Sequence, residues 1–156
     1  MVSKAGTEKN LCHCTALRKA SRRVSQLYDC ALEPCGLRIT QLAILNQIAR
    51  SGTPTIGELA EALVMERGGL AHNLKPLVRD GLVEIRADSK DRRNRLVALT
   101  AAGRKKREQS ANAWKRAQAG FEEAFGVTKL PSLRKVLGLI VSNEFATAFS
   151  RRSTQR

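Results

Sequence analysis

Three arginines are clustered in one short polar segment of the chain: Arg92, Arg93 and Arg95. The apolar runs on either side, 82–86 and 96–99, are predicted to form the strands of a β-hairpin, with 88–95 as its charged turn. Guanidinium groups on a hairpin tip can lie along phosphates or enter a narrow minor groove of duplex DNA. A merely solvated charged hairpin is the alternative. We therefore interpret the hairpin as a DNA-contacting wing.

A helix-turn-helix pattern precedes this hairpin. The first helix is predicted over 55–63, where Thr55 followed three residues later by Glu58 is the signature of a capping box. The second helix is predicted from about 66 to 80, with three leucines facing inward: Leu70, Leu74 and Leu77. A helix of this size fits the major groove, and its N-terminal residues meet base edges. The pattern predicts a winged helix-turn-helix that binds duplex DNA.

Outward positions near the start of the second helix are candidate contacts to DNA: Arg67, Gly68, Gly69, Ala71, His72, Asn73 and Lys75. Arg67 has the donors to read guanine, whereas Asn73 could pair with adenine, cap the helix or face solvent. His72 could donate to a base or a phosphate, or be solvated. Lys75 and Lys90 are expected to contact phosphate, so losing either should flatten the salt dependence of binding.

The adjacent glycines Gly68 and Gly69 are unusual inside a helix, where each costs about 1 kcal/mol relative to alanine. That cost is understandable if the backbone must come close to DNA, or if the turn into this helix is irregular. Direct readout of bases would then be weak, and more of the specificity would come from DNA shape.

Composition agrees with a polyanionic partner. The 156 residues, a length that suits one domain, include 28 Lys and Arg against 14 Asp and Glu. The formal charge of +14 favours duplex nucleic acid first and an anionic membrane second. Only 4% of residues are aromatic, which disfavours a base-stacking surface for single strands. The sequence has no glycine-rich phosphate loop, His-Glu zinc motif or G-x-S-x-G elbow, so neither an enzyme nor a cofactor is expected.

Further helices must position this DNA-binding unit. Helical periodicity indicates four of them: 11–32, 40–50, 101–125 and 131–149. Thr40 and Thr100 are the expected N-caps of the second and third. The resulting order, α-α-α-α-β-β-α-α, is mainly α with a small β-wing. The terminal helices have wide apolar faces, so we expect a twofold homodimer on a pseudo-palindromic site with half-sites about one helical turn apart.

The sequence predicts a cytoplasmic location. No apolar run approaches the roughly 18 residues of a membrane span, and the first ten residues lack the apolar core of a signal peptide. In that compartment the four cysteines would stay reduced rather than form a structural disulfide framework: Cys12, Cys14, Cys30 and Cys35.

Cys12-His13-Cys14 offers apt metal ligands, but three adjacent residues rarely surround a tetrahedral ion alone. A redox role is a second interpretation, because a helix N-terminus and nearby cations such as Lys9 and Arg18 can lower a thiol pKa. Cys30 and Cys35 could resolve an oxidised thiol only across a dimer or after local movement. The third interpretation is that Cys12 and Cys14 are simply small residues at a helix start.

The whole pattern resembles the MarR family of bacterial winged-helix regulators over about residues 11–149. Its most specific part is the wing, Asp91-Arg92-Arg93-Asn94-Arg95-Leu96-Val97-Ala98-Leu99-Thr100, which is similar to the D-x-R-x-x-x-x-x-L-T run of that family. The segment 73–83 is similar to the end of its recognition helix. The resemblance implies that Arg93 enters the groove and that Asp91 orients the arginines. The chain departs from the family near Gly68, Gly69 and Ala71, where hydroxyl residues are usual, and near His72, where arginine is common.

The resemblance also implies a homodimer that usually represses transcription and is associated with the bacterial nucleoid. Its hold on DNA is commonly released by a small, often phenolic ligand, or by oxidation of a cysteine near the N-terminal helix, here Cys12 or Cys14. A ligand site would lie between the first, second and fifth helices, where a carboxylate ligand could pair with Arg18 or Arg22. The candidate lining residues are Leu17, Arg18, Leu27, Tyr28, Ile44, Ile48 and Trp114, most of which could equally be plain core.

The expected boundaries follow from this pattern: a disordered start over 1–10, dimerisation helices over 11–33 and 101–149, a winged-helix core over 37–100 and a frayed basic tail over 150–156. An effector-independent architectural DNA-binding protein is the remaining alternative. A regulator should prefer a site near its own gene and lose it with a ligand or an oxidant, whereas an architectural protein should be indifferent to both.

Overall fold

The computed structural model describes residues 12–91 and 93–153. The predicted disordered start and Arg92 lie outside these residues. Helices and strands follow one another in this order: α1 (His13–Leu32), η1 (Glu33–Cys35), α2 (Ile39–Ser51), α3 (Ile56–Ala62), α4 (Arg67–Arg79), β1 (Val83–Ala87), β2 (Arg95–Leu99), α5 (Ala101–Phe125), η2 (Val127–Lys129), α6 (Leu130–Ile140) and α7 (Asn143–Ser153). The prediction of a mainly helical fold with a small wing is confirmed.

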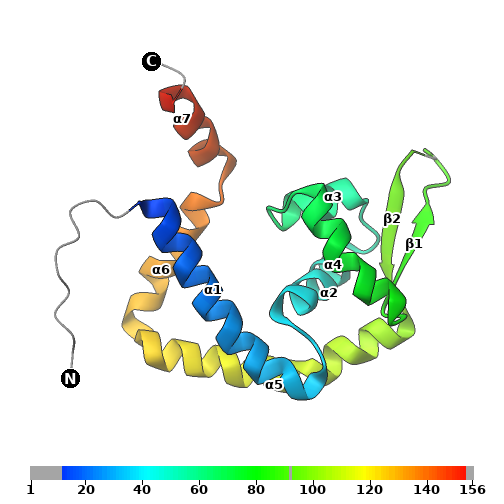
Figure 1. The fold of residues 1–156 in the computed structure, drawn as a ribbon, viewed down its shortest axis with the longest axis horizontal. Helices are drawn as coiled ribbons and strands as arrows, with labels where there is room; N and C mark the ends of the chain where they lie inside the picture. Colours follow the sequence, from blue (N-terminus) through cyan, green and yellow to red (C-terminus); the bar gives the residue numbers. More distant parts are fainter. Residues whose placement is uncertain (1–11, 92, 154–156) are drawn as a thin grey trace.

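The elements form two arms that α5 joins (Figure 1). One arm contains α2, α3, α4 and the hairpin of β1 and β2, and the other contains α1, α6 and α7. The predicted inward leucines Leu70, Leu74 and Leu77 are buried in the first arm. They pack in one core with side chains of α2, α3, β2 and the segment before α2, among them Leu37, Ile44, Leu45, Ile48, Leu59 and Val97.

The predicted capping box forms at the start of α3. The Thr55 hydroxyl accepts a hydrogen bond from the Glu58 backbone N–H at 3.1 Å, and the Glu58 carboxylate accepts one from the Thr55 N–H at 2.8 Å. The Thr55 hydroxyl also donates to this carboxylate at 2.9 Å, and the bonds from the Thr55 backbone N–H and hydroxyl hold the pKa of Glu58 below its ordinary value. The same segment joins the wing, because the Val97 N–H donates to the Pro54 carbonyl at 2.8 Å. The start of the helix-turn-helix is therefore tied to β2.

Replacing Thr55 by alanine should lower the free energy of unfolding by about 1 kcal/mol, as the loss of an N-cap does. Urea denaturation measures this, and Thr53→Ala, in the exposed loop just before, should change it little. Because the folded-state pKa of Glu58 is lowered, its contribution is present above the unfolded pKa and is lost as the pH falls through the folded pKa. The gap between wild type and Thr55→Ala should therefore narrow in acid; a gap that widens would contradict the capping box.

The start of α5 lies directly against the chain before β1. Thr100 caps the helix, accepting from the Gly103 N–H at 3.0 Å, and its hydroxyl donates to the Gly81 carbonyl at 2.6 Å. Its own N–H donates to the Leu82 carbonyl at 3.2 Å. Gly103 is buried, and a Cβ added there would overlap the carbonyl oxygen of Leu82. Only glycine lets α5 begin this close to the wing.

Two helix predictions were wrong. The second helix begins at Ile39 rather than being capped by Thr40, because Asp29 accepts from the Ile39 N–H at 2.6 Å and Gln41 accepts from the Arg38 N–H at 2.9 Å. The last helix, predicted over 131–149, is two helices. The Ser142 hydroxyl accepts from the Phe145 N–H at 3.2 Å and so starts α7 afresh. Helix α7 extends through Ser153, so residues 150–153 are helical where a frayed tail was expected.

Candidate nucleic-acid interface

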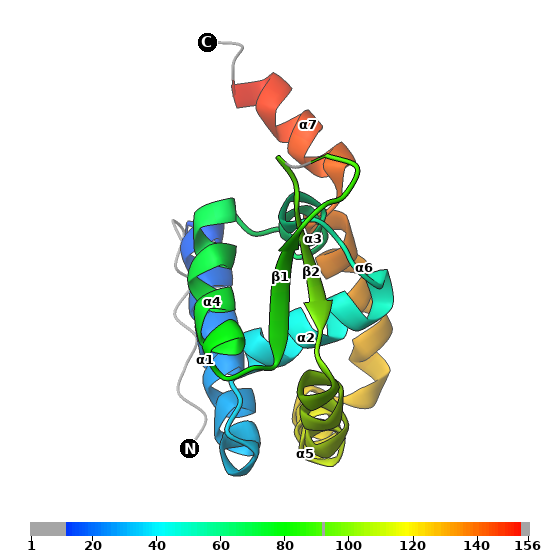
Figure 2. The same ribbon diagram turned by 90° about the vertical axis from the view of Figure 1, so that its right-hand side faces the viewer.

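Helix α4 presents its first turns to solvent. Arg67, Gly68, Gly69, His72 and Lys75 are all exposed, while the leucines of the opposite face are buried. The β1–β2 hairpin runs beside α4, with which β1 is in contact (Figure 2). The outward residues that the sequence singles out therefore lie on one helix face, next to the wing.

The two glycines of α4 lie in regular helix beneath open space. The helix begins at Arg67, and a Cβ added at Gly68 or Gly69 would meet nothing within 4 Å. The irregularity of the turn lies earlier, at Val64, whose φ of 51° is left-handed. The Asn73 side-chain N–H donates to the Gly69 carbonyl at 2.8 Å, so this amide group is held against its own helix.

Two aspartates organise the turn of the wing. Asp88 accepts from the Lys90 backbone N–H at 2.8 Å, and Asp91 accepts from the Arg93 backbone N–H at 3.0 Å. The Asp91 carboxylate also lies 3.4 Å from Nε of Arg93. The Arg93 side chain is nevertheless 92% exposed. Asp91 thus contacts an arginine that is almost fully exposed, and Arg95 lies exposed at the start of β2.

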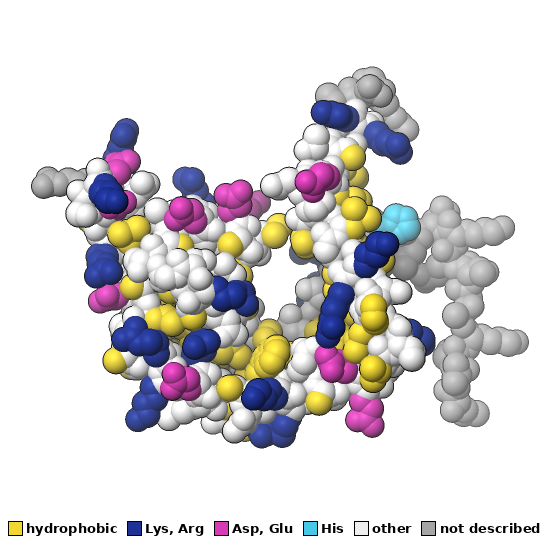
Figure 3. Space-filling view, turned by 180° about the vertical axis from the view of Figure 1, so that it is seen from behind, with side chains coloured by type: hydrophobic (Ala, Val, Ile, Leu, Met, Phe, Trp, Pro, Cys, Tyr) yellow, Lys and Arg dark blue, Asp and Glu magenta, His cyan; other side chains and the backbone are white. Residues whose placement is uncertain are grey.

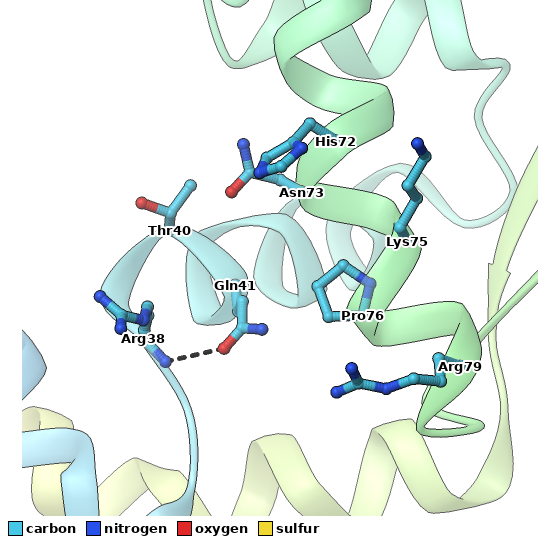
Figure 4. A pocket seen from close by; sticks show the side chains of 8 residues that line it. All are labelled: Arg38, Thr40, Gln41, His72, Asn73, Lys75, Pro76 and Arg79. Carbon is cyan, nitrogen blue, oxygen red and sulfur yellow. Dashed lines mark hydrogen bonds between the residues drawn. The ribbon is translucent and has the colours of Figure 1, made fainter.

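A groove of about 550 Å³ between the start of α2 and α4 adds residues that sequence reasoning missed (Figure 4). Arg38, Thr40 and Gln41 approach from α2, and Arg79 extends the α4 side beyond His72, Asn73 and Lys75. Three cationic side chains line the groove: Arg38, Lys75 and Arg79. Arg79 Nε contacts Asp80 at 2.8 Å, and this hydrogen bond lowers the pKa of Asp80. No local sequence pattern indicates that the residues at the start of α2 lie beside α4, because they lie more than thirty positions before Lys75.

The predicted ligand-lining residues do not share one environment. Ile44 and Ile48 are fully buried in the core, whereas Leu17, Leu27 and Trp114 are exposed on α1 and α5, as is Arg18. Tyr28 on α1 is buried; its hydroxyl donates to the Gln118 side-chain oxygen at 2.8 Å, and its ring lies 6.5 Å from that of Phe121. The pKa of the Tyr28 hydroxyl is raised, mainly because the group is partly buried.

The N-terminal cysteines are exposed at the start of α1, with Cys12 at the N-cap. Hydrogen bonds from Thr15, backbone first and then hydroxyl, lower the pKa of the Cys12 thiol. Cys30 is also exposed and Cys35 is half-buried. Among the described residues, no group of three His, Cys, Asp or Glu side chains is placed to hold a metal ion. Nor does any helix of this part of the chain have both the length and the apolarity to cross a membrane.

A helix-turn-helix followed by a two-stranded hairpin, with α4 exposed beside it, defines the chain as a winged-helix protein. The family model of the MarR family matches residues 36–94. MosR, a transcriptional regulator from M. tuberculosis solved in complex with DNA, is 34% identical, with a TM-score of 0.78, 88% of this chain and 98% of that one being covered. The chain belongs to the MarR family of transcriptional regulators, which are DNA-binding proteins and not enzymes.

Two further proteins are similar to the chain. A mutant of MarR from E. coli, complexed with operator DNA, shares the fold at a TM-score of 0.74 and 22% identity, with 82% of this chain and 92% of that one covered. The transcriptional activatory protein BadR from Rhodopseudomonas palustris is 34% identical over 98 residues. That match covers 54% of this chain and 56% of BadR.

Proposed function

We propose that this chain is a sequence-specific regulator that binds duplex DNA as a homodimer, represses transcription and is released by a small ligand. The observation that carries the proposal is the pairing of an exposed α4 start with a wing whose Arg93 is almost fully exposed and contacts Asp91. The DNA complexes of MosR and of the MarR mutant support the same role for this chain.

In the proposed complex α4 enters the major groove and the wing follows the backbone into the minor groove. The open space above Gly68 and Gly69 allows the helix backbone to approach the bases closely. Arg67 and His72 would reach base edges, and Asn73 would contribute its amide oxygen and its second N–H, since one N–H already donates to Gly69. Phosphates would be held by Lys75 and Lys90, the wing arginines Arg92 and Arg95, and the newly recognised cations Arg38 and Arg79.

Homodimer formation would cover the apolar face of the arm formed by α1, α6 and α7. Hydrophobic side chains run along this arm in the space-filling view (Figure 3). The large exposed ones include Leu17, Leu27, Val136, Leu137, Leu139 and Phe145. A second copy related by a twofold axis would bury them and present two α4 helices to a pseudo-palindromic site. A releasing ligand must then bind more tightly to a dimer whose α4 helices are wrongly spaced for DNA than to the DNA-bound dimer.

The deciding experiment is fluorescence anisotropy of the purified protein on the DNA upstream of its own gene, against a scrambled duplex, at several salt concentrations. A regulator should prefer its own site by at least about a thousandfold at physiological salt. Equal, steeply salt-dependent binding to both duplexes would favour an architectural protein, and absence of binding to either would contradict the proposal.

A cysteine-based redox switch is the second candidate, favoured by the exposed Cys12 thiol with its lowered pKa. The thiolate is the form that reacts with peroxide, so Cys12 should be oxidised before most of the other thiols. In this second candidate function, oxidation of Cys12 weakens DNA binding. We expect Cys12→Ser to keep full affinity for DNA and to lose the response to peroxide, measured by the same anisotropy. Cys30→Ser, on an exposed thiol at the far end of α1, is the matched control and should respond like wild type. An unaltered peroxide response in Cys12→Ser would exclude this role for Cys12.

A further inference from the structure

Asp29 of α1 holds the start of α2 from outside that helix. Its Oδ1 accepts a hydrogen bond from the Ile39 backbone N–H at 2.6 Å, and its Oδ2 lies 3.7 Å from a guanidinium nitrogen of Arg38. The Asp29 side chain is only 28% exposed, whereas that of Arg38 is 80% exposed. One carboxylate on the arm of α1 therefore contacts both the first N–H of α2 and the cation next to it.

The groove between α2 and α4 shares its two arginines with a neighbouring cavity. This cavity, of about 490 Å³, lies between the end of α1, the start of α2 and the end of α4, and Asp29 and Asp80 both line it. Arg38 and Arg79 line the cavity and the groove alike, one on each side of the groove (Figure 4). Arg79 donates to Asp80 at 2.8 and 3.3 Å. Each groove arginine is thus paired with an aspartate of the cavity, and a guanidinium group paired in this way keeps further N–H donors for a phosphate.

Sequence preference alone favours another start for α2. Threonine is a preferred residue at an N-cap, which makes Thr40 the local choice, whereas the observed N-cap is Arg38. The observed start is supported by Asp29 from α1 and by Gln41, which accepts from the Arg38 N–H at 2.9 Å. A helix capped by Thr40 would begin at Gln41 and would leave Arg38 and Ile39 outside it. The place of Arg38 beside α4 therefore depends on a carboxylate of α1.

We propose that Asp29 is a positioning residue for DNA binding, whose carboxylate holds Arg38 and the first turn of α2 where they meet the phosphate backbone. The proposal rests on the proposed function, because the phosphates are those of the bound duplex. It links the arm of α1 to the phosphate contacts, since a shift of α1 away from α2 would release Arg38 without moving α4.

The proposal predicts an effect on affinity whose sign is opposite to that of net charge. Removing an acid makes the chain more basic, and this change by itself favours binding to DNA. Removing an acid that holds a phosphate-binding arginine in place weakens binding instead. The two explanations are therefore separated by the direction of the change as well as by its size.

The test is fluorescence anisotropy of the full chain on the duplex upstream of its gene, with Asp29→Asn and Glu33→Gln compared. Asparagine keeps an oxygen that can accept from the Ile39 N–H but loses the charge next to Arg38. Asp29→Asn should weaken binding about five- to tenfold, because a surface ion pair contributes little alone but the proposed dimer carries two. Glu33→Gln removes the same charge from an exposed position of the same cavity and should bind within about twofold of wild type, or more tightly.

A double-mutant cycle separates positioning from a purely structural role. In an Arg38→Gln background, Asp29→Asn should cost less than about twofold, because the cation that it holds is gone. Equal losses in the two backgrounds would overturn the action of Asp29 through Arg38. Binding by Asp29→Asn as tight as that by Glu33→Gln would overturn the proposal as a whole.

Thermal unfolding tests the start of α2 without DNA. Thr40→Ala should change the Tm little in the wild-type chain, and should lower it by about 2–4 °C in Asp29→Ala, where Thr40 would become the N-cap. Equal shifts in the two backgrounds would contradict the alternative start. If Asp29→Ala does not fold, Asp29→Asn still tests the contact with Arg38.

The outcome for Asp29 can be separated from the outcome for the proposed function. Phosphate contacts do not depend on base sequence, so the same variants can be compared on the scrambled duplex. If wild type binds both duplexes equally and Asp29→Asn still weakens binding, only the proposed function is contradicted. If wild type prefers its own duplex and Asp29→Asn binds as tightly, only this inference is contradicted. Absence of binding to either duplex contradicts both.

Discussion

Replacing Gly103 by alanine is expected to destabilise the folded chain by about 2–3 kcal/mol, the upper range for inserting a methyl group into a packed site. The added Cβ would overlap the carbonyl oxygen of Leu82, a backbone atom that cannot move aside as a side chain can. To relieve the overlap, α5 would have to shift away from the hairpin, and the bonds from Thr100 to Gly81 and Leu82 would lengthen. Urea denaturation followed by circular dichroism measures the change.

Gly120→Ala is the matched control on the same helix. It has open space where a Cβ would stand, and alanine is the better helix former by up to about 1 kcal/mol. The two substitutions should therefore have opposite signs. If both stabilise the chain, the close approach of α5 to Leu82 is not a feature of the protein in solution.

The second large effect is expected at the tip of the wing. Replacing Arg93 by alanine should weaken binding to the operator about ten- to hundredfold, as loss of a groove-reading arginine does. The side chain is almost fully exposed, and its ion pair with Asp91 at 3.4 Å lies at the surface, so the fold should be unaffected. Anisotropy gives the affinity, and sedimentation shows whether the proposed dimer stays intact.

Arg116→Ala removes the same charge from an exposed position of α5, outside the wing and α4. It should cost little at physiological salt, because a charge more than a Debye length from the DNA is largely screened. Equal affinities for Arg93→Ala and wild type would remove Arg93 from the interface. Equal losses for Arg93→Ala and Arg116→Ala would assign the effect to net charge.

Sequence reasoning succeeded where structure is decided locally. The capping box at Thr55 and Glu58 depends on residues three apart, and the wing is set by alternating apolar runs around a turn with two aspartates. Thr100 likewise marks the start of α5, which ends at Phe125 as predicted. These features need no knowledge of distant contacts, because their hydrogen bonds close within one turn or one hairpin.

The features that were missed depend on contacts between distant segments. Arg38 lies beside α4 only because α2 packs across it, and no periodicity in α2 could reveal that groove. The role of Gly103 requires the position of Leu82, twenty-one residues earlier. The break between α6 and α7 was missed for a different reason. Its apolar pattern runs on through Val141, so the capping hydroxyl of Ser142 was outweighed by hydrophobic periodicity.

Helix α5 has one more consequence, which follows from its length. Its 25 residues form a rod of about 37 Å, joined to the hairpin at Thr100 and to α1 through Tyr28, Gln118 and Phe121. A tilt of about 5° at one end displaces the other by about 3 Å, roughly the rise of one base pair. In the proposed dimer, a small rearrangement near Tyr28 would therefore be enough to move α4 out of register with its half-site, without any local unfolding.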